Sequence, residues 1–260
     1  GKKWLDSIEY NTRVKELTEK IEGKKVTEQS LDEYLAIIKD SGKFKVDYGE
    51  NGLVTKLKKV FDDSEFDFPV ARNLRELRPD TLLFIGNFNP IKGISSNIFP
   101  KYVSLNADFG DSEVTDLGRL QSIGQSASFG GSKVTDLGQL QSIGGNAYFR
   151  QSEVTDLGQL QSIGGNVSFG ASEVTDLGQL QSIGGNASFA NSEVTDLGQL
   201  QSIGGNTEFI YSEVTDLGQL QSIGRNADFE GSKVTGLGQL QSIGGFAYFG
   251  ASEVTDLGQL

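Results

Sequence analysis

Few residue types that carry chemistry are present, and those that are present recur at a fixed spacing. The 260-residue chain has no Cys and no His. Thiolate nucleophiles, imidazole bases, disulfides and thiolate or imidazole metal sites are therefore excluded. Carboxylate pairs such as Glu153 with Asp156 could do acid–base work, but nearly every twenty residues bring another pair. A pattern repeated along the chain indicates a scaffold and not one active site, so we expect no enzymatic activity and no cofactor.

The most regular of these carboxylates form a column, one at the same position of each successive repeat. Its members are Asp116, Asp136, Asp156, Asp176, Asp196, Asp216 and Asp256. One carboxylate per repeat is few for Ca²⁺, which takes six to eight oxygen ligands, and Gly236 interrupts the column. An Asp after Thr is typical of a turn in which the side chain bonds its own backbone. We therefore predict turn-forming aspartates and no metal site.

These residues belong to a twenty-residue unit that dominates the chain. The stretch 146–165 reads NAYFRQSEVTDLGQLQSIGG, and 166–185 repeats it with few changes. Phe recurs without insertion or deletion at 109, 129, 149, 169, 189, 209, 229 and 249. A fixed period near twenty is typical of a solenoid, in which each unit is one coil stacked on the next. The sequence predicts eight such repeats over residues 106–260.

The apolar positions within one copy predict its local structure. Ala147 and Phe149 have period two and predict a short strand. The other apolar residues step by three, a spacing that suits 3₁₀ or extended turns around one core. They are Val154, Leu157, Leu160 and Ile163. Gly-Gly pairs before the strand permit tight corners. The predicted fold class is a mostly β solenoid.

The pattern A-x-F-x-x-S-x-V resembles the leucine-rich-repeat core L-x-L-x-x-N-x-L, and the following L-G-x-L-x-x-I resembles the convex side of short bacterial leucine-rich repeats. The resemblance covers residues 103–260, with a weaker first coil from residue 74. It implies a surface adhesin or secreted effector that binds ligands on a concave strand face, outside the cell or on the bacterial surface. Ser stands where that family has Asn, and the spacing before the strand is one residue longer. A different β-solenoid is the alternative.

The segments before the repeats predict a different organisation. Residues 1–68 predict a helical N-terminal domain, with helices ending before Gly23 and starting at Ser30. Phe44–Tyr48 and residues 53–60 are compatible with strand–turn–strand or with turn and helix. Residues 69–105 predict a degenerate first coil and capping segment. A cap for the solenoid is the simplest role for this region, because a first coil would otherwise expose an unpaired strand edge, and a separate functional domain is the alternative.

Differences between the copies predict where a ligand binds. The apolar core positions hardly vary, whereas the residue between Ala and Phe and the residues just after Phe change from copy to copy. Alternation along a strand turns these side chains away from the core. Aromatic residues and Arg dominate interface energies. The candidate ligand-binding residues are Tyr148, Arg150, Glu208, Ile210, Tyr211, Asp228, Phe246 and Tyr248. Neutral drift of exposed positions is the alternative explanation.

The charge distribution restricts the partners. Residues 1–100 carry 17 Lys+Arg and 17 Asp+Glu, whereas residues 101–260 carry 6 and 18, which accounts for the net charge of −12. Such an acidic array repels phosphate backbones, and no apolar run reaches the length of a membrane span. We expect a recognition module for a protein or glycan, with no nucleic acid and no membrane insertion. The alternative is a structural subunit whose terminal coils self-associate end to end into a fibre.

Overall fold

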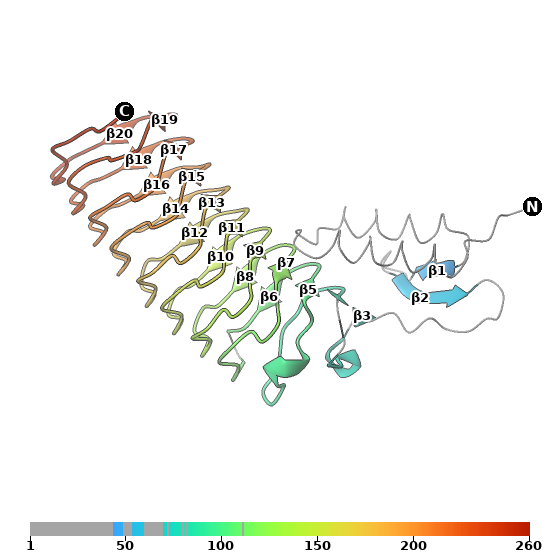
Figure 1. Cartoon of the computed structure of the whole chain (residues 1–260). Coiled ribbons are helices and arrows are strands. Elements are labelled where there is room, and N and C mark those ends of the chain that lie inside the picture. The colour runs from blue at the N-terminus through green and yellow to red at the C-terminus, as the bar shows by residue number, and fades with distance from the viewer. Residues whose placement is uncertain are drawn as a thin grey trace, which may run out of the picture.

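The structure of the protein is a computed structural model, and it describes residues 44–48, 54–59, 70–71, 73–79, 81, 83–110 and 112–260. From residue 106 onward, the chain winds into a parallel β-solenoid of about eight coils (Figure 1). Successive coils are about twenty residues long, because each strand pairs in register with the strand twenty residues further on. The predicted solenoid and its period are confirmed. Within the described residues, no helix has the length and apolarity needed to cross a bilayer.

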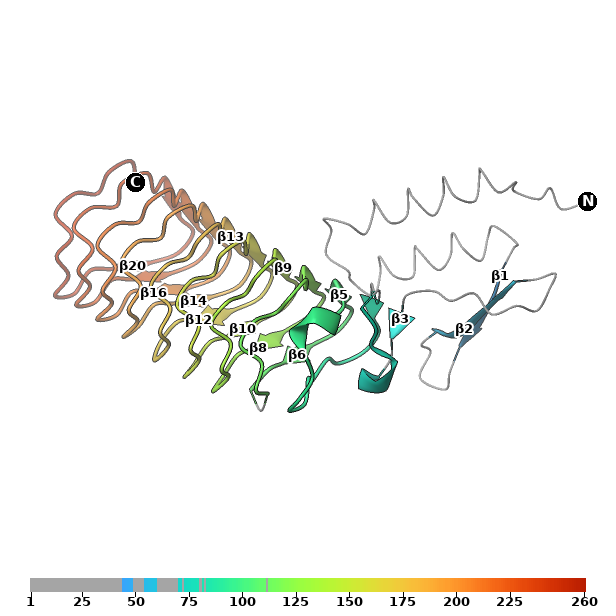
Figure 2. The same ribbon diagram turned by 60° about the horizontal axis from the view of Figure 1, so that its bottom comes forward.

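Each regular coil contributes one two-residue strand to each of two parallel sheets (Figure 2). The eight-stranded sheet consists of β6 (Ala107–Asp108), β8 (Ala127–Ser128), β10 (Ala147–Tyr148), β12 (Val167–Ser168), β14 (Ala187–Ser188), β16 (Thr207–Glu208), β18 (Ala227–Asp228) and β20 (Ala247–Tyr248). The ten-stranded sheet consists of β3 (Val70–Ala71), β4 (Leu83–Phe84), β5 (Tyr102–Val103), β7 (Ser122–Ile123), β9 (Ser142–Ile143), β11 (Ser162–Ile163), β13 (Ser182–Ile183), β15 (Ser202–Ile203), β17 (Ser222–Ile223) and β19 (Ser242–Ile243).

The second sheet corrects the sequence prediction. The three-residue spacing of Val154 to Ile163 predicted 3₁₀ or extended turns, and Ser162–Ile163 is instead a strand. Within the described residues, the two 3₁₀ helices, η1 (Leu74–Glu76) and η2 (Ser96–Ile98), lie before the regular repeats. The spacing misled because each strand is only two residues long, too short to show the alternation from which strands are recognised.

The two sheets bond to their neighbours in opposite directions along the stack. In the ten-stranded sheet, Gly164 N–H donates to Ile143 O of the preceding coil at 2.8 Å, whereas in the eight-stranded sheet Ala147 N–H donates to Asn166 O of the following coil at 2.9 Å. A third side of the coil is held by isolated bridges between aspartates such as Asp156 and Asp176. Both sheets therefore join every pair of neighbouring regular coils, and bridges on the third side join five of the seven pairs.

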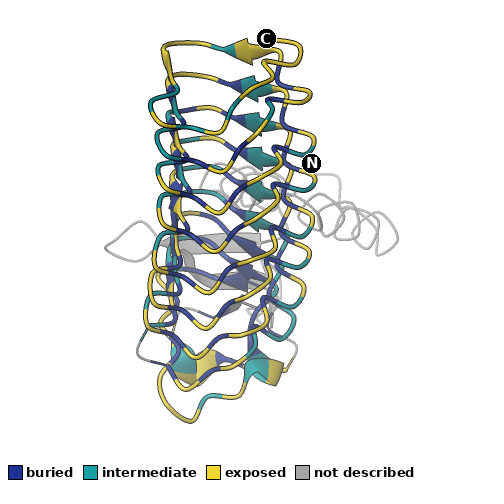
Figure 3. Ribbon diagram, turned by 90° about the vertical axis from the view of Figure 1, so that its left-hand side faces the viewer, coloured by how far each residue is buried: buried dark blue, intermediate teal, exposed yellow. Residues whose placement is uncertain are grey.

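The interior consists of apolar columns that run the length of the stack (Figure 3). From Phe109 to Phe249, consecutive phenylalanine rings stack with centroids 4.9–5.8 Å apart. Val, two Leu and Ile of each repeat form parallel columns that are buried along most of the array. Burial of this repeated apolar surface is the main contribution that stabilises a coil on its neighbour.

Asparagine side chains bond across the corners between the two sheets. Asn146 Oδ1 accepts a hydrogen bond from Asn166 N–H at 2.7 Å, and the same bond recurs from coil to coil up to Asn226 and Phe246. The adjacent glycines are required by close packing, since a Cβ at Gly184 would overlap the carbonyl oxygen of Gly164. These corners fix the coil spacing, which explains why the Gly and Asn positions vary so little.

The region before the repeats differs from the prediction in part. Within the segment expected to be a helical domain, residues 1–68, the described parts are two antiparallel strands, β1 (Phe44–Tyr48) and β2 (Val54–Lys59). The helical prediction is wrong for these two segments, and the strand–turn–strand alternative is correct. The helices predicted before Phe44 lie outside the described residues.

Irregular coils lead into the array. β3, β4 and β5 extend the ten-stranded sheet, and Phe88 forms a bridge with Ala107. Phe88 lies edge-to-face against Phe84, Phe99 and Phe109 at centroid distances of 5.1, 5.0 and 6.3 Å. These rings pack together in the interior of the irregular coils. The degenerate first coil predicted between 69 and 105 is thus part of the same stack.

Candidate binding surface

The eight predicted residues lie on and beside the outer face of one sheet. Tyr148, Glu208, Asp228 and Tyr248 are the second residues of strands in the eight-stranded sheet. Arg150, Ile210 and Tyr211 follow in the turn after the strand, and Phe246 lies at the corner before it. Because the strands pair in register, the strand positions form one line along the solenoid. We call this line and the two residues after each Phe the variable face.

Large aromatic side chains are exposed on the variable face. Tyr148 is 49% exposed and Tyr211 60% exposed, in coils that are covered on both sides. Phe246 and Tyr248 are also exposed, but they lie in the final coil, which packs on one neighbour only. The exposure of Tyr148 and Tyr211 is therefore the stronger evidence for a binding surface. Ile210 is half-buried between its neighbours.

The turn after each Phe places one residue in the left-handed region of backbone conformation. Gly131 and Gly231 occupy this position with φ of 66° and 59°, and Gln151 and Tyr211 occupy it with φ of 58° and 49°. Glycine adopts this conformation without penalty, whereas an L-residue pays about 1 kcal/mol. Tyr211 thus holds a large exposed side chain at a position where the backbone favours glycine.

Local contacts orient the larger side chains of the variable face. The Tyr211 ring lies over Gly231 of the following coil, where a Cβ would collide with it. Asn146 Nδ2 donates to the Tyr148 hydroxyl at 2.9 Å. Ser188 Oγ donates to the Glu208 carboxylate at 3.0 Å. These contacts hold the side chains in defined positions over the sheet.

Side-chain size and charge change along the variable face in a definite order. The coil of Tyr148 and Arg150 carries large residues and the positive charge. The next two coils carry small, uncharged residues: Ser168, Gly170, Ala171, Ser188, Ala190 and Asn191. The following two coils carry large and acidic ones: Glu208, Ile210, Tyr211, Asp228 and Glu230. The face therefore has a basic and an acidic region separated by two coils of small residues.

Other exposed columns vary less. The column of Glu153 holds Glu in six copies and Lys in two, at Lys133 and Lys233. Gln161 is exposed, and its column holds Gln in every copy from 121 to 241. Thr155 is also exposed, and its column is invariant. Thr175 donates to Thr155 O through both its N–H and its hydroxyl, so a structural role explains why this column is invariant. The backbone of Gln161 also bonds both neighbouring coils, since its N–H donates to Gln141 O at 2.8 Å and its carbonyl accepts from Gln181 N–H at 2.9 Å. Within the described structure no hydrogen bond is seen for the Gln161 side chain, so these bonds do not require glutamine at this position. Exposure alone therefore does not account for the variation on the face of the eight-stranded sheet.

The aspartate column has the structural role predicted for it. Asp156 Oδ1 accepts a hydrogen bond from Gly158 N–H at 2.6 Å, and equivalent bonds recur along the column. Each aspartate thus closes a turn around a glycine of positive φ. Among the described residues, no cluster of carboxylates could hold a metal ion.

A small cluster of ion pairs lies on this third side of the coil. Lys133 Nζ lies 3.0 Å from a Glu113 carboxylate oxygen, and Lys92 Nζ lies 3.4 Å from the other. The hydrogen bond and charge of Lys133, followed by those of Lys92, lower the pKa of Glu113. The Glu113 side chain is 47% exposed, so the pairing is a surface feature and not a functional site.

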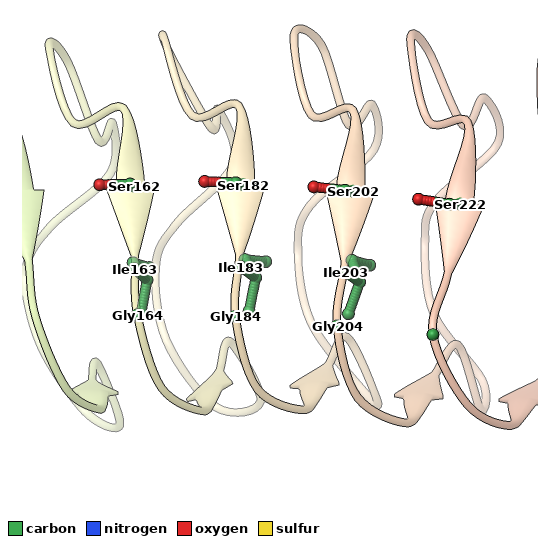
Figure 4. Close-up of a pocket in the computed structure, with 11 residues that line it drawn as sticks. Ser162, Ile163, Gly164, Ser182, Ile183, Gly184, Ser202, Ile203, Gly204 and Ser222 are labelled. Carbon is green, nitrogen blue, oxygen red and sulfur yellow. The ribbon is translucent and has the colours of Figure 1, made fainter. Parts of the chain in front are cut away.

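A shallow groove of about 410 Å³ follows the ten-stranded sheet across the coils from Ser162 to Gly224. Ser, Ile and Gly line it in three coils, and Ser222 and Gly224 line it in the fourth. The serine side chains of neighbouring coils point the same way (Figure 4). Close packing of the corners requires the glycines there, as for Gly184. The groove is therefore a consequence of coil packing, and its lining carries no charged residue.

Sequence reasoning did not single out two residues that the structure places in the same surface. Gln151 adjoins Arg150 in the left-handed position, and Glu230 lies in the turn next to Asp228, whose carboxylate accepts its N–H at 3.0 Å. Both positions vary between copies in the sequence, but the choice of candidate residues gave preference to aromatic residues and Arg.

Comparisons with known proteins identify no relative from which a ligand could be inferred. No family model, no curated protein and no solved structure matches the chain.

Proposed function

We propose that the protein is a non-enzymatic recognition module that binds its partner on the variable face. One observation carries the proposal: variation between copies gathers on this exposed side, while the exposed Gln161 column stays constant. Copies that arose by duplication begin identical, so faster change at one set of exposed positions favours a selected surface over drift.

The residue types on the variable face suit a protein or a glycan. Tyrosine offers a flat apolar ring with a hydroxyl at its edge, which suits partly wet contacts. Carboxylates and Arg150 add directional hydrogen bonds. The net charge of −12 disfavours nucleic acid as the partner.

The family assignment remains part of the proposal. The resemblance to the leucine-rich-repeat core would make the strand face the usual ligand side and would place the protein outside the cell or on a bacterial surface. The second parallel sheet in each coil is a feature that the resemblance did not predict. The binding proposal rests on the variable face and does not require that family.

The test compares the native chain with a variant in which large side chains of the variable face are replaced by the small residues found at the same positions of other coils. The variant carries Tyr148→Ser, Ile210→Gly, Tyr211→Gly and Tyr248→Ser, each a residue found at that position in another coil. Both chains are labelled and applied to a printed glycan array and to an array of extracellular protein domains. We expect ligands that the native chain binds and the variant does not, while circular dichroism melting shows that the variant is no less stable than the native chain. Equal binding of every ligand by both chains would contradict the proposal.

A further inference from the structure

Two neighbouring corners of the array carry a three-residue pattern that the proposed function does not use. Asn166-Val167-Ser168 and Asn186-Ala187-Ser188 each place a hydroxyl two residues after an asparagine, and no other asparagine of the chain is followed in this way. Asn-x-Ser/Thr, with x other than Pro, is the acceptor pattern for N-linked glycans. We propose that Asn166 and Asn186 are modification sites for an N-linked glycan. This inference does not depend on which ligand the variable face binds.

The fold presents the asparagine and the hydroxyl of each pattern on the solvent side of the strand. Val167 is buried, whereas Asn166 and Ser168 are exposed, because alternate residues of a strand point to opposite faces. The second pattern repeats this arrangement around the buried Ala187, with Ser188 partly covered. A glycan attached at either asparagine therefore extends into solvent and does not enter the core.

Hydrogen bonds at the corners orient the amide nitrogen that would be modified. Asn166 Oδ1 accepts from Asn186 N–H at 2.7 Å, and Asn186 Oδ1 accepts from Asn206 N–H at 2.8 Å. Because the donor is a backbone N–H, the bonded side-chain atom must be the oxygen. The amide is planar, so Nδ2 points away from this bond. In the part of the chain that the structure describes, Nδ2 of Asn166 and of Asn186 makes no hydrogen bond.

The modification leaves the contact between coils intact. Nδ2 attacks the anomeric carbon of a sugar chain activated as a lipid-linked glycosyl diphosphate. The bond from that carbon to the diphosphate oxygen breaks, the diphosphate leaves, and Nδ2 loses one proton to a base of the transferase. The product is still an amide whose Oδ1 accepts hydrogen bonds. The bond from Asn186 N–H to Asn166 Oδ1 therefore persists in the modified chain.

Small neighbours leave room for a sugar on these two coils. The glycine pairs before Asn166 and Asn186 carry no side chain, and the variable-face residues of both coils are small and uncharged. In the preceding coil, Asn146 Nδ2 instead donates to the Tyr148 hydroxyl at 2.9 Å. Neighbouring coils lie about 4.8 Å apart, so glycans on both sites would crowd each other. We expect most chains to carry one glycan.

Secretion of the full chain from a eukaryotic cell line tests the proposal. The mass of the chain is measured before and after treatment with peptide N-glycosidase, which leaves Asp in place of each modified Asn. Peptide mass spectrometry then identifies the site, and we expect it to be Asn166 or Asn186. Asn206 and Asn226 occupy the same corner without a following hydroxyl and should stay unmodified. Chain retained in the cells is measured in the same way, because transfer precedes folding.

Exchanges of the two serines test the pattern and leave the asparagine bonds in place. Ser168→Ala combined with Ser188→Ala should abolish the glycan, whereas Ser168→Thr combined with Ser188→Thr should retain it. Tyr148→Ser places a hydroxyl two residues after Asn146 and should make this asparagine a third acceptor. Circular dichroism melting of each variant checks that the coil stack persists.

Three results would overturn the inference. The first is a native chain that carries no glycan in either the secreted or the retained fraction, which would leave the array test of the proposed function intact. The second is a glycan that persists in the double alanine variant. The third is modification of Asn206 or Asn226, because the corner and not the following hydroxyl would then determine the acceptor.

Discussion

The two parallel sheets of the solenoid are built by the same chain geometry and carry different outer faces. Both use two-residue strands paired in register with the next coil. The ten-stranded sheet presents Ser from Ser122 to Ser242 without change, whereas the variable face presents Asp, Ser, Tyr and Glu at equivalent positions. Backbone pairing cannot require uniformity of one outer face and diversity of the other. The difference therefore separates a constant scaffold from a surface that has changed.

The largest expected effect tests the scaffold side of this comparison. Phe169→Ala removes a fully buried ring from the middle of the phenylalanine column. We expect a loss of about 3–5 kcal/mol in the free energy of unfolding. Chemical denaturation followed by circular dichroism measures it, and a lower m-value would indicate that the array splits into two units. A loss below about 1 kcal/mol would show that the rings are not close-packed.

A glycine corner gives the next largest effect. Gly184→Ala would place a methyl group against the carbonyl oxygen of Gly164 in the preceding coil. We expect destabilisation of about 1–3 kcal/mol. The matched control is Ser168→Ala on the variable face, which should stay within about 0.5 kcal/mol of the native chain. Equal stability of the two variants would remove the physical reason for the constant corners.

On the variable face the comparison predicts a change of opposite sign. Gln151→Gly relieves a positive φ of 58° at an exposed turn. We expect the free energy of unfolding to rise by up to about 1 kcal/mol, measured by chemical denaturation. Gly131→Gln makes the reverse change, at a position with a φ of 66° where a Cβ meets no other atom, and should destabilise the chain. Destabilisation by Gln151→Gly would mean that the Gln151 side chain stabilises the fold. The variable face would then be constrained by folding, contrary to the difference drawn between the two sheets.

The smallest effect concerns the ion pair on the third side. Because Lys133 and Lys92 depress the pKa of folded Glu113, the pair stabilises the fold above the unfolded pKa, and this contribution is lost as pH falls through the folded pKa. Lys133→Ala should raise the pKa of Glu113 towards its ordinary value. A carboxyl NMR titration measures the shift. An unchanged pKa would show that the lysine makes no contact in solution.

The sequence was sufficient for the solenoid, its period and the inward direction of Phe149, because identical units stacked in register repeat every constraint. It was sufficient for the turn role of Asp156, since Asp before a Leu-Gly step favours a local bond. It failed for Ser162–Ile163, because a two-residue strand has no periodicity to detect. The pairing of strands across coils decides that structure, and no local pattern reports it.

The candidate surface was only partly predictable for a related reason. Variation between copies pointed to Tyr148 and Tyr211, and alternation gave their outward direction. The left-handed conformation of Tyr211 and the hydrogen bond from Ser188 to Glu208 depend on the coil geometry.

One measurement tests the central claim most directly, which is that binding belongs to the variable face. Three chains are compared on the same glycan and protein arrays: the native chain, the variable-face variant described above, and a control carrying Gln161→Ala, Gln181→Ala, Gln201→Ala and Gln221→Ala. The control removes as many exposed side chains from the constant surface. The account predicts that the glutamine control keeps the native ligands and the variable-face variant loses them. Loss in both chains, or in the glutamine control alone, would contradict it.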